Sequence, residues 1–168
     1  MKRNVNYSLY LVTDREVLKK RDLCLSVEQA IQGGVTVVQL REKDVSSLEF
    51  YKIALEVKNI TDKYNVPLII NDRLDIAMAV DAAGVHVGQS DLTCEVVRKI
   101  LGDNKIVGIS TATVEEAIAA ERNGADYIGV GAMYSTQTKT DARPVSIETL
   151  AKIKQSIHLP VVAIGGIN

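Results

Sequence analysis

One pattern recurs three times along this chain, and it limits the folds that the chain can adopt. A glycine that ends an expected helix is followed at once by a short apolar run, at Gly34, Gly84 and Gly124. Repetition of this kind indicates repeated βα units. Strands that are apolar on both faces are typical of parallel sheets whose faces are covered by helices. The pattern therefore predicts an α/β fold with a parallel sheet.

Apolar runs and helix-capping residues predict seven strands that alternate with helices. The expected strands cover residues 7–13, 35–40, 67–70, 85–87, 106–109, 125–130 and 160–164. The expected helices cover residues 23–32, 46–64, 74–83, 93–101, 113–123 and 146–156.

Two architectures fit this alternation, an open doubly wound sheet and a (β/α)₈ TIM barrel. The barrel is favoured because Asp14 and Arg15 follow the first strand, where a dinucleotide fold would carry a glycine-rich turn, and because polar residues follow nearly every strand. A barrel needs eight strands and about 250 residues. We therefore expect residues 1–168 to form a single barrel domain that stops after strand seven and lacks its last βα unit.

Composition excludes several classes of function. The chain has 20 basic and 21 acidic residues and a net charge of -1, so no field favours nucleic acid or an anionic membrane. No apolar run is long enough for a membrane span or a signal peptide. Cys24 and Cys94 lack metal-type spacing, as expected of reduced thiols in the cytoplasm. We expect a cytoplasmic protein with small-molecule partners.

Two groups of residues at strand ends are candidates for binding anions. Residues 135–139, Ser-Thr-Gln-Thr-Lys, offer hydroxyl, amide and ammonium donors, although such a run also suits a solvated turn. Arg41 and Lys43 would point to the same side of an extended segment, as suits a diphosphate. The alternative is a solvated pair that Glu42 and Asp44 neutralise.

Asp72 and Asp91 follow the third and fourth expected strands and could hold one hard cation between them. Mg²⁺ typically takes one or two carboxylates and completes its shell with water and phosphate oxygens. Carboxylates that cap helices are an equally good interpretation of this pair. His86 lies within the fourth strand, where a hydrogen-bonded core histidine is the simplest interpretation.

Six segments at strand ends, taken together and in order, resemble the thiamine-phosphate synthase family. They span nearly the whole chain: YLVTD (10–14), QLREK (39–43), INDRLDIA (70–77), GVHVGQSD (84–91), GADYIGVGAMYSTQTK (124–139) and VVAIGGI (161–167). The resemblance implies a (β/α)₈ barrel that joins 4-amino-2-methyl-5-hydroxymethylpyrimidine diphosphate to 4-methyl-5-(2-phosphoethyl)thiazole, or its carboxylate tautomer. The products would be thiamine phosphate and pyrophosphate, with Mg²⁺ as cofactor.

The resemblance also implies roles for individual residues. Those matching the pyrimidine diphosphate contacts are Gln39, Leu40, Arg41, Glu42, Lys43, Asn71, Ser110 and Lys139. Those matching the thiazole phosphate contacts are Thr136, Gln137, Thr138 and Gly166, and those matching the Mg²⁺ ligands are Asp72 and Asp91. Arg41, Lys43 and Lys139 would be the catalytic cations that stabilise the departing pyrophosphate.

Two departures from the family pattern stand out. Ala132 to Ser135 replace the more usual Pro-Ile-Phe-Pro, and the eighth unit, whose backbone completes the thiazole phosphate site in relatives, is not in the sequence. Alternatives are an isomerase resembling thiazole tautomerase and a non-catalytic barrel that binds phosphate ligands. The retained cations and carboxylates argue against the isomerase, which needs neither a diphosphate site nor a Mg²⁺ site.

Overall fold

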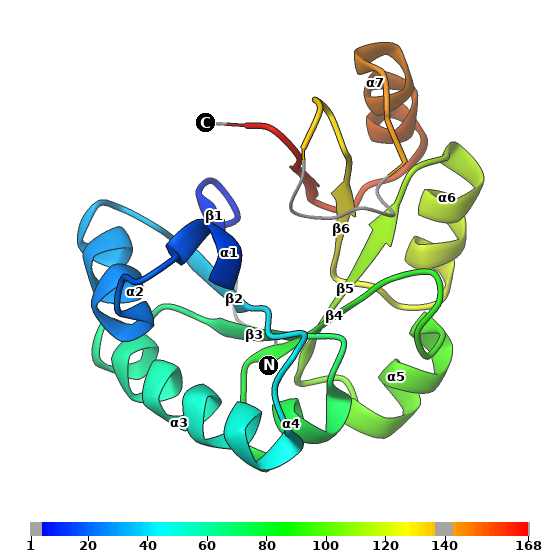
Figure 1. The fold of residues 1–168 in the computed structure, drawn as a ribbon. Coiled ribbons are helices and arrows are strands. Elements are labelled where there is room, and N and C mark those ends of the chain that lie inside the picture. Colours follow the sequence, from blue (N-terminus) through cyan, green and yellow to red (C-terminus); the bar gives the residue numbers. More distant parts are fainter. Residues whose placement is uncertain (1–4, 137–142, 168) are drawn as a thin grey trace. The chain divides into compact units, whose positions relative to one another are not determined.

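Strands and helices alternate along the chain in the computed structural model, which describes residues 5–136 and 143–167 (Figure 1). The strands are β1 (Tyr10–Val12), β2 (Val37–Leu40), β3 (Leu68–Asn71), β4 (Gly84–Val87), β5 (Ile106–Thr111), β6 (Tyr127–Val130) and β7 (Val161–Ala163). The helices are α1 (Arg15–Leu18), α2 (Leu23–Gln32), α3 (Ser47–Lys63), α4 (Leu74–Ala79), α5 (Cys94–Leu101), α6 (Val114–Arg122) and α7 (Ile147–Ser156).

The chain forms two compact units, which meet in sequence between His86 and Val87. In the first unit, β1 pairs with β2, β2 with β3 and β3 with β4, all in parallel. In the second unit, β5 pairs with β6 and β6 with β7, again in parallel. Every described pair joins strands that are consecutive in sequence, so the parallel α/β arrangement predicted from the sequence is confirmed.

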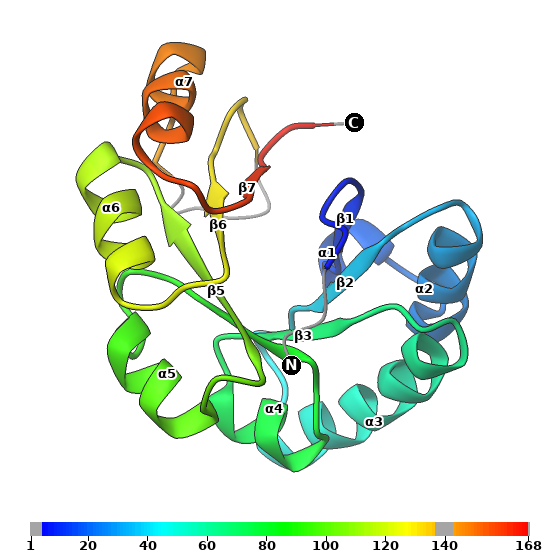
Figure 2. The same cartoon turned by 180° about the vertical axis from the view of Figure 1, so that it is seen from behind.

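Helix α3 shows how the sequence builds the first unit. Phe50, Ala54 and Val57 recur at helical spacing and are at most 1% exposed. They belong to a helix that contacts β2 and β3, as the view in Figure 2 also shows. Both strands are buried along their whole length. This explains their nearly continuous apolar sequence, as expected of strands covered on both faces.

Of the seven helices in the described part of the chain, six lie where the sequence predicts them, within a few residues at each end. Ser46, Thr113 and Ser146 each cap the helix that follows by accepting a backbone N–H. The exception is α1, a single turn that follows β1. The sequence did not predict it because four residues show no helical periodicity.

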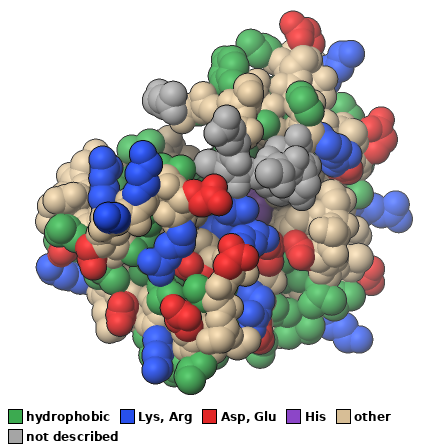
Figure 3. All heavy atoms as spheres, in the orientation of Figure 1, with side chains coloured by type: hydrophobic (Ala, Val, Ile, Leu, Met, Phe, Trp, Pro, Cys, Tyr) green, Lys and Arg blue, Asp and Glu red, His purple; other side chains and the backbone are tan. Residues whose placement is uncertain are grey.

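The distribution of charge and the state of the cysteines both agree with the sequence analysis. Acidic and basic side chains are intermixed on the face shown in Figure 3. Cys24 and Cys94 are both free thiols, as predicted. Within the described ranges, no helix has both the length and the apolar character needed to cross a membrane.

Arg98 of α5 fastens the start of β5 and β6 in the second unit. Its guanidinium donates to the carbonyls of Gly102, Lys105 and Gly124 at 2.6 to 3.1 Å. It also donates to the Asp126 carboxylate at 2.5 Å, and the same oxygen accepts from the Val107 amide at 2.8 Å. Both charged side chains are 13% exposed. The planar fork of arginine serves several acceptors at once, which lysine cannot do.

We expect Arg98→Lys to lower the free energy of unfolding by about 2–4 kcal/mol, because carbonyl and carboxylate acceptors lose their donors in a partly buried place. Urea unfolding followed by circular dichroism measures this. Arg122→Lys on the exposed end of α6 is the matched control and should change the free energy by less than about 0.5 kcal/mol. Equal effects of the two variants would show that the Arg98 network contributes nothing specific.

Candidate functional site

Both cations that leave β2 are paired with carboxylates at neighbouring strand ends. The Arg41 Nη1 atom lies 3.1 Å from Asp14 Oδ2, which follows β1. The Lys43 Nζ atom lies 2.5 Å from Asp72 Oδ2, which follows β3. The cations predicted to bind a diphosphate are therefore held among the carboxylates of the adjacent strands.

The two residues beside Arg41 are buried, which limits how they could contact a ligand. Leu40 is 0% exposed, so its side chain belongs to the core and only its backbone could reach a substrate. The Glu42 side chain is 1% exposed and accepts from Arg15 Nε through both oxygens, at 2.8 and 3.0 Å. The Glu42 carboxylate is thus satisfied within the protein, and it anchors the end of β2 to the start of α1.

Gln39 and Asn71, both predicted to contact the pyrimidine, are buried polar residues at 5% and 8% exposure. Gln39 Nε2 donates to the Tyr10 hydroxyl at 2.9 Å, which fixes the amide through a neighbour on β1. Asn71 ends β3 opposite His86 of β4, and His86 is buried as predicted. A few buried polar side chains at strand ends can hydrogen-bond a ligand and fix its orientation.

Asp72 occupies an unusual backbone position. Its φ angle of 59° lies in the left-handed region, and its amide donates to the His86 carbonyl at 2.8 Å. The guanidinium of the next residue, Arg73, donates hydrogen bonds to the Asp75 carboxylate and the Ser47 hydroxyl at 2.6 to 2.9 Å. Arg73 is therefore part of the local structure, and Lys43 is the cation that contacts Asp72.

In the second unit, the end of β4 is tied to the end of β5. Asp91 Oδ2 accepts from the Gly88 amide at 2.8 Å, and Gln89 Nε2 donates to the Ser110 carbonyl at 2.7 Å. The Gly88 to Asp91 loop lines one end of a hollow of about 380 Å³ that continues between α5 and α6. Asp91 thus has a structural role in its turn, beside the metal role predicted for it.

The segments after β6 and β7 are joined by backbone hydrogen bonds. The amides of Met133 and Tyr134 donate to the carbonyls of Ile164 and Gly165, both at 2.9 Å. Gly166 has a φ angle of 65°, and a Cβ atom placed on it would lie 2.8 Å from the Tyr134 Cβ. Thr136 is half-buried at the end of this loop. Gln137, Thr138 and Lys139 lie outside the described residues.

The structure thus brings the predicted residues together in two groups. Gln39 to Lys43, Asn71 and Asp72 lie at the ends of β2 and β3 in the first unit. In the second unit, Asp91, Thr136 and Gly166 follow β4, β6 and β7. Ser110 lies inside β5, because this strand continues to Thr111 and does not end at residue 109 as the sequence predicted. Sequence reasoning missed the partners Tyr10, Thr13, Asp14 and Arg15, although it noted that charge follows the first strand.

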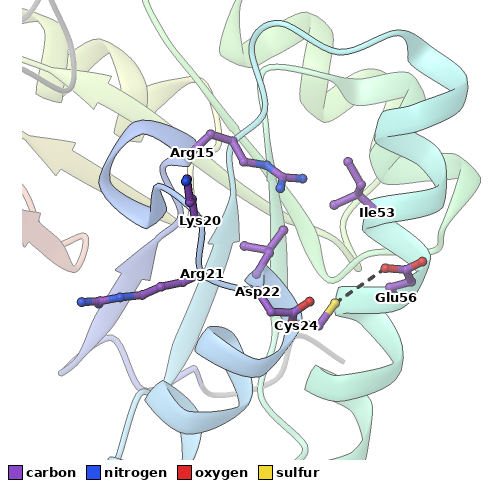
Figure 4. A pocket seen from close by; sticks show the side chains of 8 residues that line it. Arg15, Lys20, Arg21, Asp22, Cys24, Ile53 and Glu56 are labelled. Carbon is purple, nitrogen blue, oxygen red and sulfur yellow. Dashed lines mark hydrogen bonds between the residues drawn. The ribbon is translucent and has the colours of Figure 1, made fainter.

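A second hollow, of about 350 Å³, lies in the first unit between the α1–α2 segment and α3 (Figure 4). Arg15 extends over it toward Ile53, and the Cys24 thiol donates to Glu56 at 3.7 Å. Burial and the nearby Glu56 carboxylate raise the pKa of Cys24 above its usual value. Among the described residues, no three His, Cys, Asp or Glu side chains cluster as a metal site.

Comparison with known proteins assigns both fold and family. The family model for thiamine monophosphate synthase matches residues 9–168. A thiamine-phosphate synthase of Clostridium beijerinckii is 61% identical over 168 residues, covering 100% of this chain and 80% of the relative. Another, of Alkaliphilus oremlandii, is 64% identical over 163 residues, covering 97% of this chain and 78% of the relative.

Solved structures agree with this assignment of family and fold. The thiamine phosphate pyrophosphorylase of Pyrococcus furiosus has a TM-score of 0.87 and 41% identity, covering 96% of this chain and 76% of its own. FabK of Thermotoga maritima has a TM-score of 0.69 at 20% identity, covering 84% of this chain and 49% of its own, and shows a likeness of fold alone. The predicted TIM-barrel class of fold is confirmed.

We expect Gly166→Ala to destabilise the loop after β7, because alanine would meet Tyr134 in addition to bearing the cost of a left-handed φ. Gly102→Ala is the matched control, since its φ of 69° is similar but no atom lies within 4 Å of the added Cβ. The left-handed cost alone is about 1–2 kcal/mol. Thermal unfolding should show a larger loss for Gly166→Ala, and equal losses would refute the close contact.

Proposed function

This chain belongs to the thiamine monophosphate synthase family, and we propose that it joins the pyrimidine diphosphate to the thiazole phosphate to form thiamine phosphate and pyrophosphate. The observation that carries the proposal is 61% identity to a thiamine-phosphate synthase along all 168 residues. It makes the protein a transferase of thiamine biosynthesis, with two small molecules as its substrates.

The reaction needs charge stabilisation more than a nucleophilic side chain. The carbon–oxygen bond between the pyrimidine methylene and the diphosphate breaks, and the electron pair leaves with the diphosphate. The thiazole nitrogen then supplies the electron pair of the new carbon–nitrogen bond. Fixed cations beside the departing oxygens stabilise the developing charge. Arg41 and Lys43 supply such cations at the end of β2, and Lys139 would supply a third.

The pairing of these cations leaves them able to bind a phosphate. A guanidinium has five N–H donors, and Asp14 accepts from one nitrogen of Arg41. The side chains of Arg41 and Lys43 are 20% and 49% exposed. Both are therefore partly open to a ligand while their resting positions are already restricted. Such restriction lowers the entropy lost when a ligand binds.

The carboxylates at the ends of β3 and β4 suit Mg²⁺, which prefers oxygen ligands and often binds through one or two carboxylates plus water and phosphate. Asp72 is partly exposed, and Asp91 has one oxygen engaged by the Gly88 amide. Bound there, Mg²⁺ would supply positive charge to the diphosphate oxygens. Lys43 pairs with Asp72 in the protein without ligands. If Mg²⁺ took its place at that carboxylate, the Lys43 ammonium would be available to pair with the diphosphate.

The thiazole phosphate would bind where the loops after β6 and β7 meet. Gly165 lies against Ala132, and Gly166 lies against Tyr134 and Ser135, too closely for a side chain at either glycine. Backbone N–H groups and the Thr136 hydroxyl are donors suited to a phosphate. Gln137 and Thr138 would add to this set. Holding both substrates in fixed positions is then the main task of the protein.

The direct test mixes the two substrates with Mg²⁺ and follows thiamine phosphate and pyrophosphate by chromatography. We expect the products in equal amounts. Formation of neither product by folded protein would overturn the proposal. Isomerisation of the thiazole substrate without condensation would favour the isomerase instead.

We also expect Asp72→Asn to raise the Mg²⁺ concentration for half-maximal turnover by at least about tenfold, since the negative charge of a metal ligand is lost. Asp75→Asn is the matched control, because this exposed carboxylate lies in the same segment and pairs with Arg73. Turnover measured over a Mg²⁺ series distinguishes the two. An unchanged Mg²⁺ dependence in Asp72→Asn would remove Asp72 from the metal site.

A further inference from the structure

Residues at the end of β1 bind both the main-chain amide and the side chain of Arg41. Thr13 Oγ1 accepts from the Arg41 amide at 3.0 Å, and the Thr13 amide donates to the Gln39 carbonyl at 3.0 Å. Asp14 Oδ2 then accepts from the guanidinium at 3.1 Å. Thr13 is 5% exposed, so its two hydrogen bonds are sheltered from water. Arg41 is thus fixed at its backbone and at its tip by two consecutive residues.

Asp14 is itself held by a second set of bonds. Its Oδ1 atom accepts from the amides of Glu16 and Val17, at 2.9 and 3.1 Å, and caps α1. One carboxylate oxygen therefore fixes Asp14 to α1, and the other fixes Arg41 to Asp14. With both oxygens engaged, the carboxylate has little freedom to rotate.

A neighbouring ion pair, Arg15 with Glu42, also connects α1 to the end of β2. Arg15, the first residue of α1, binds the buried Glu42 carboxylate through Nε, and its side chain also extends over the hollow toward Ile53 of α3 (Figure 4). Asp14 thus binds Arg41, and the next residue, Arg15, binds the next residue, Glu42. Each pair joins an acidic side chain to a basic one. The short helix α1 is locked against the end of β2 by two ion pairs.

We propose that Asp14 is a positioning residue, which orients the Arg41 guanidinium for the diphosphate of the pyrimidine substrate. This rests on the proposed function, in which Arg41 binds that diphosphate. Asp14 contacts one nitrogen of Arg41, and the remaining N–H groups have no hydrogen-bond partner among the described residues. They are the donors that a diphosphate would engage. Asp14 acts through Arg41 and makes no contact with the substrate.

A purely structural role as helix cap makes a different prediction. Asparagine caps helices as well as aspartate does. Its single carbonyl oxygen can replace Oδ1 at α1, but its amide nitrogen cannot accept a hydrogen bond from Arg41. Asp14→Asn therefore keeps the cap and removes the hold on the guanidinium. Asp14→Ser serves as a second variant, since serine also caps but is too short to reach Arg41.

The test compares Asp14→Asn and Arg41→Ala, singly and together, in the full chain. Asp14→Asn should raise the KM for the pyrimidine diphosphate and the inhibition constant of pyrophosphate about tenfold, the effect of losing one hydrogen bond to a charged group. The KM for the thiazole phosphate and the melting temperature should stay as they are. In the Arg41→Ala background, Asp14→Asn should add nothing. Asp22→Asn is the matched control, because Asp22 also caps a helix, accepting from the Leu25 amide at the start of α2 at 2.7 Å.

Several outcomes would overturn the proposal. An unchanged diphosphate KM in Asp14→Asn and Asp14→Ser, with Arg41→Ala impaired, shows that Arg41 needs no positioning and leaves the proposed function standing. A full additional loss in the double variant shows that Asp14 acts without Arg41. An Arg41→Ala variant that keeps its diphosphate KM removes the premise, and with it the diphosphate assignment of Arg41.

Discussion

Parallel pairing of consecutive strands is the constraint on which the candidate site depends. A chain that pairs β1, β2 and β3 in parallel must return through a helix after each strand, so the three strands end at the same edge. Val12 is opposite Gln39, and Leu40 is opposite Ile70. Residues one to three positions beyond these strand ends are therefore neighbours, although they lie about thirty positions apart in sequence.

The consequence at this edge is a set of charges that neutralise one another. Asp14, Arg41, Lys43 and Asp72 form alternating pairs across three strand ends, and Glu42 and Arg15 form a third pair beside them. Pairs that water reaches add little to folding stability, with typical values of about 0–1 kcal/mol. Their contribution is to orientation: each cation is restrained before a ligand arrives. A near-neutral protein can therefore hold an anion locally without a strong overall field.

The sequence predicts the elements well because the signals for them are local. Apolar runs locate the strands, and Ser46, Thr113 and Ser146 mark helix starts through a hydrogen bond a few residues away. The ion pairs of Arg41 and Glu42 could not be predicted in this way, because their partners lie 27 positions earlier and depend on strand register. The alternative considered from the sequence was that Glu42 and Asp44 neutralise Arg41 and Lys43, whereas in the structure Asp14 and Asp72 pair with them. The binding roles assigned to the site residues, including Gln137, Thr138 and Lys139, stay predictions.

The two units present different chemistry at their strand ends. The first relies on charged side chains, whose contacts tolerate small shifts because charge interactions weaken slowly with distance. The second relies on closely packed backbone around Gly165 and Gly166, where an added methyl group would overlap Ala132 or Tyr134. Backbone donors are fixed in direction and suit a terminal phosphate that must be held but not expelled. Cations that are already restrained suit a diphosphate whose charge increases as it departs, because they stabilise that charge without first having to reorganise.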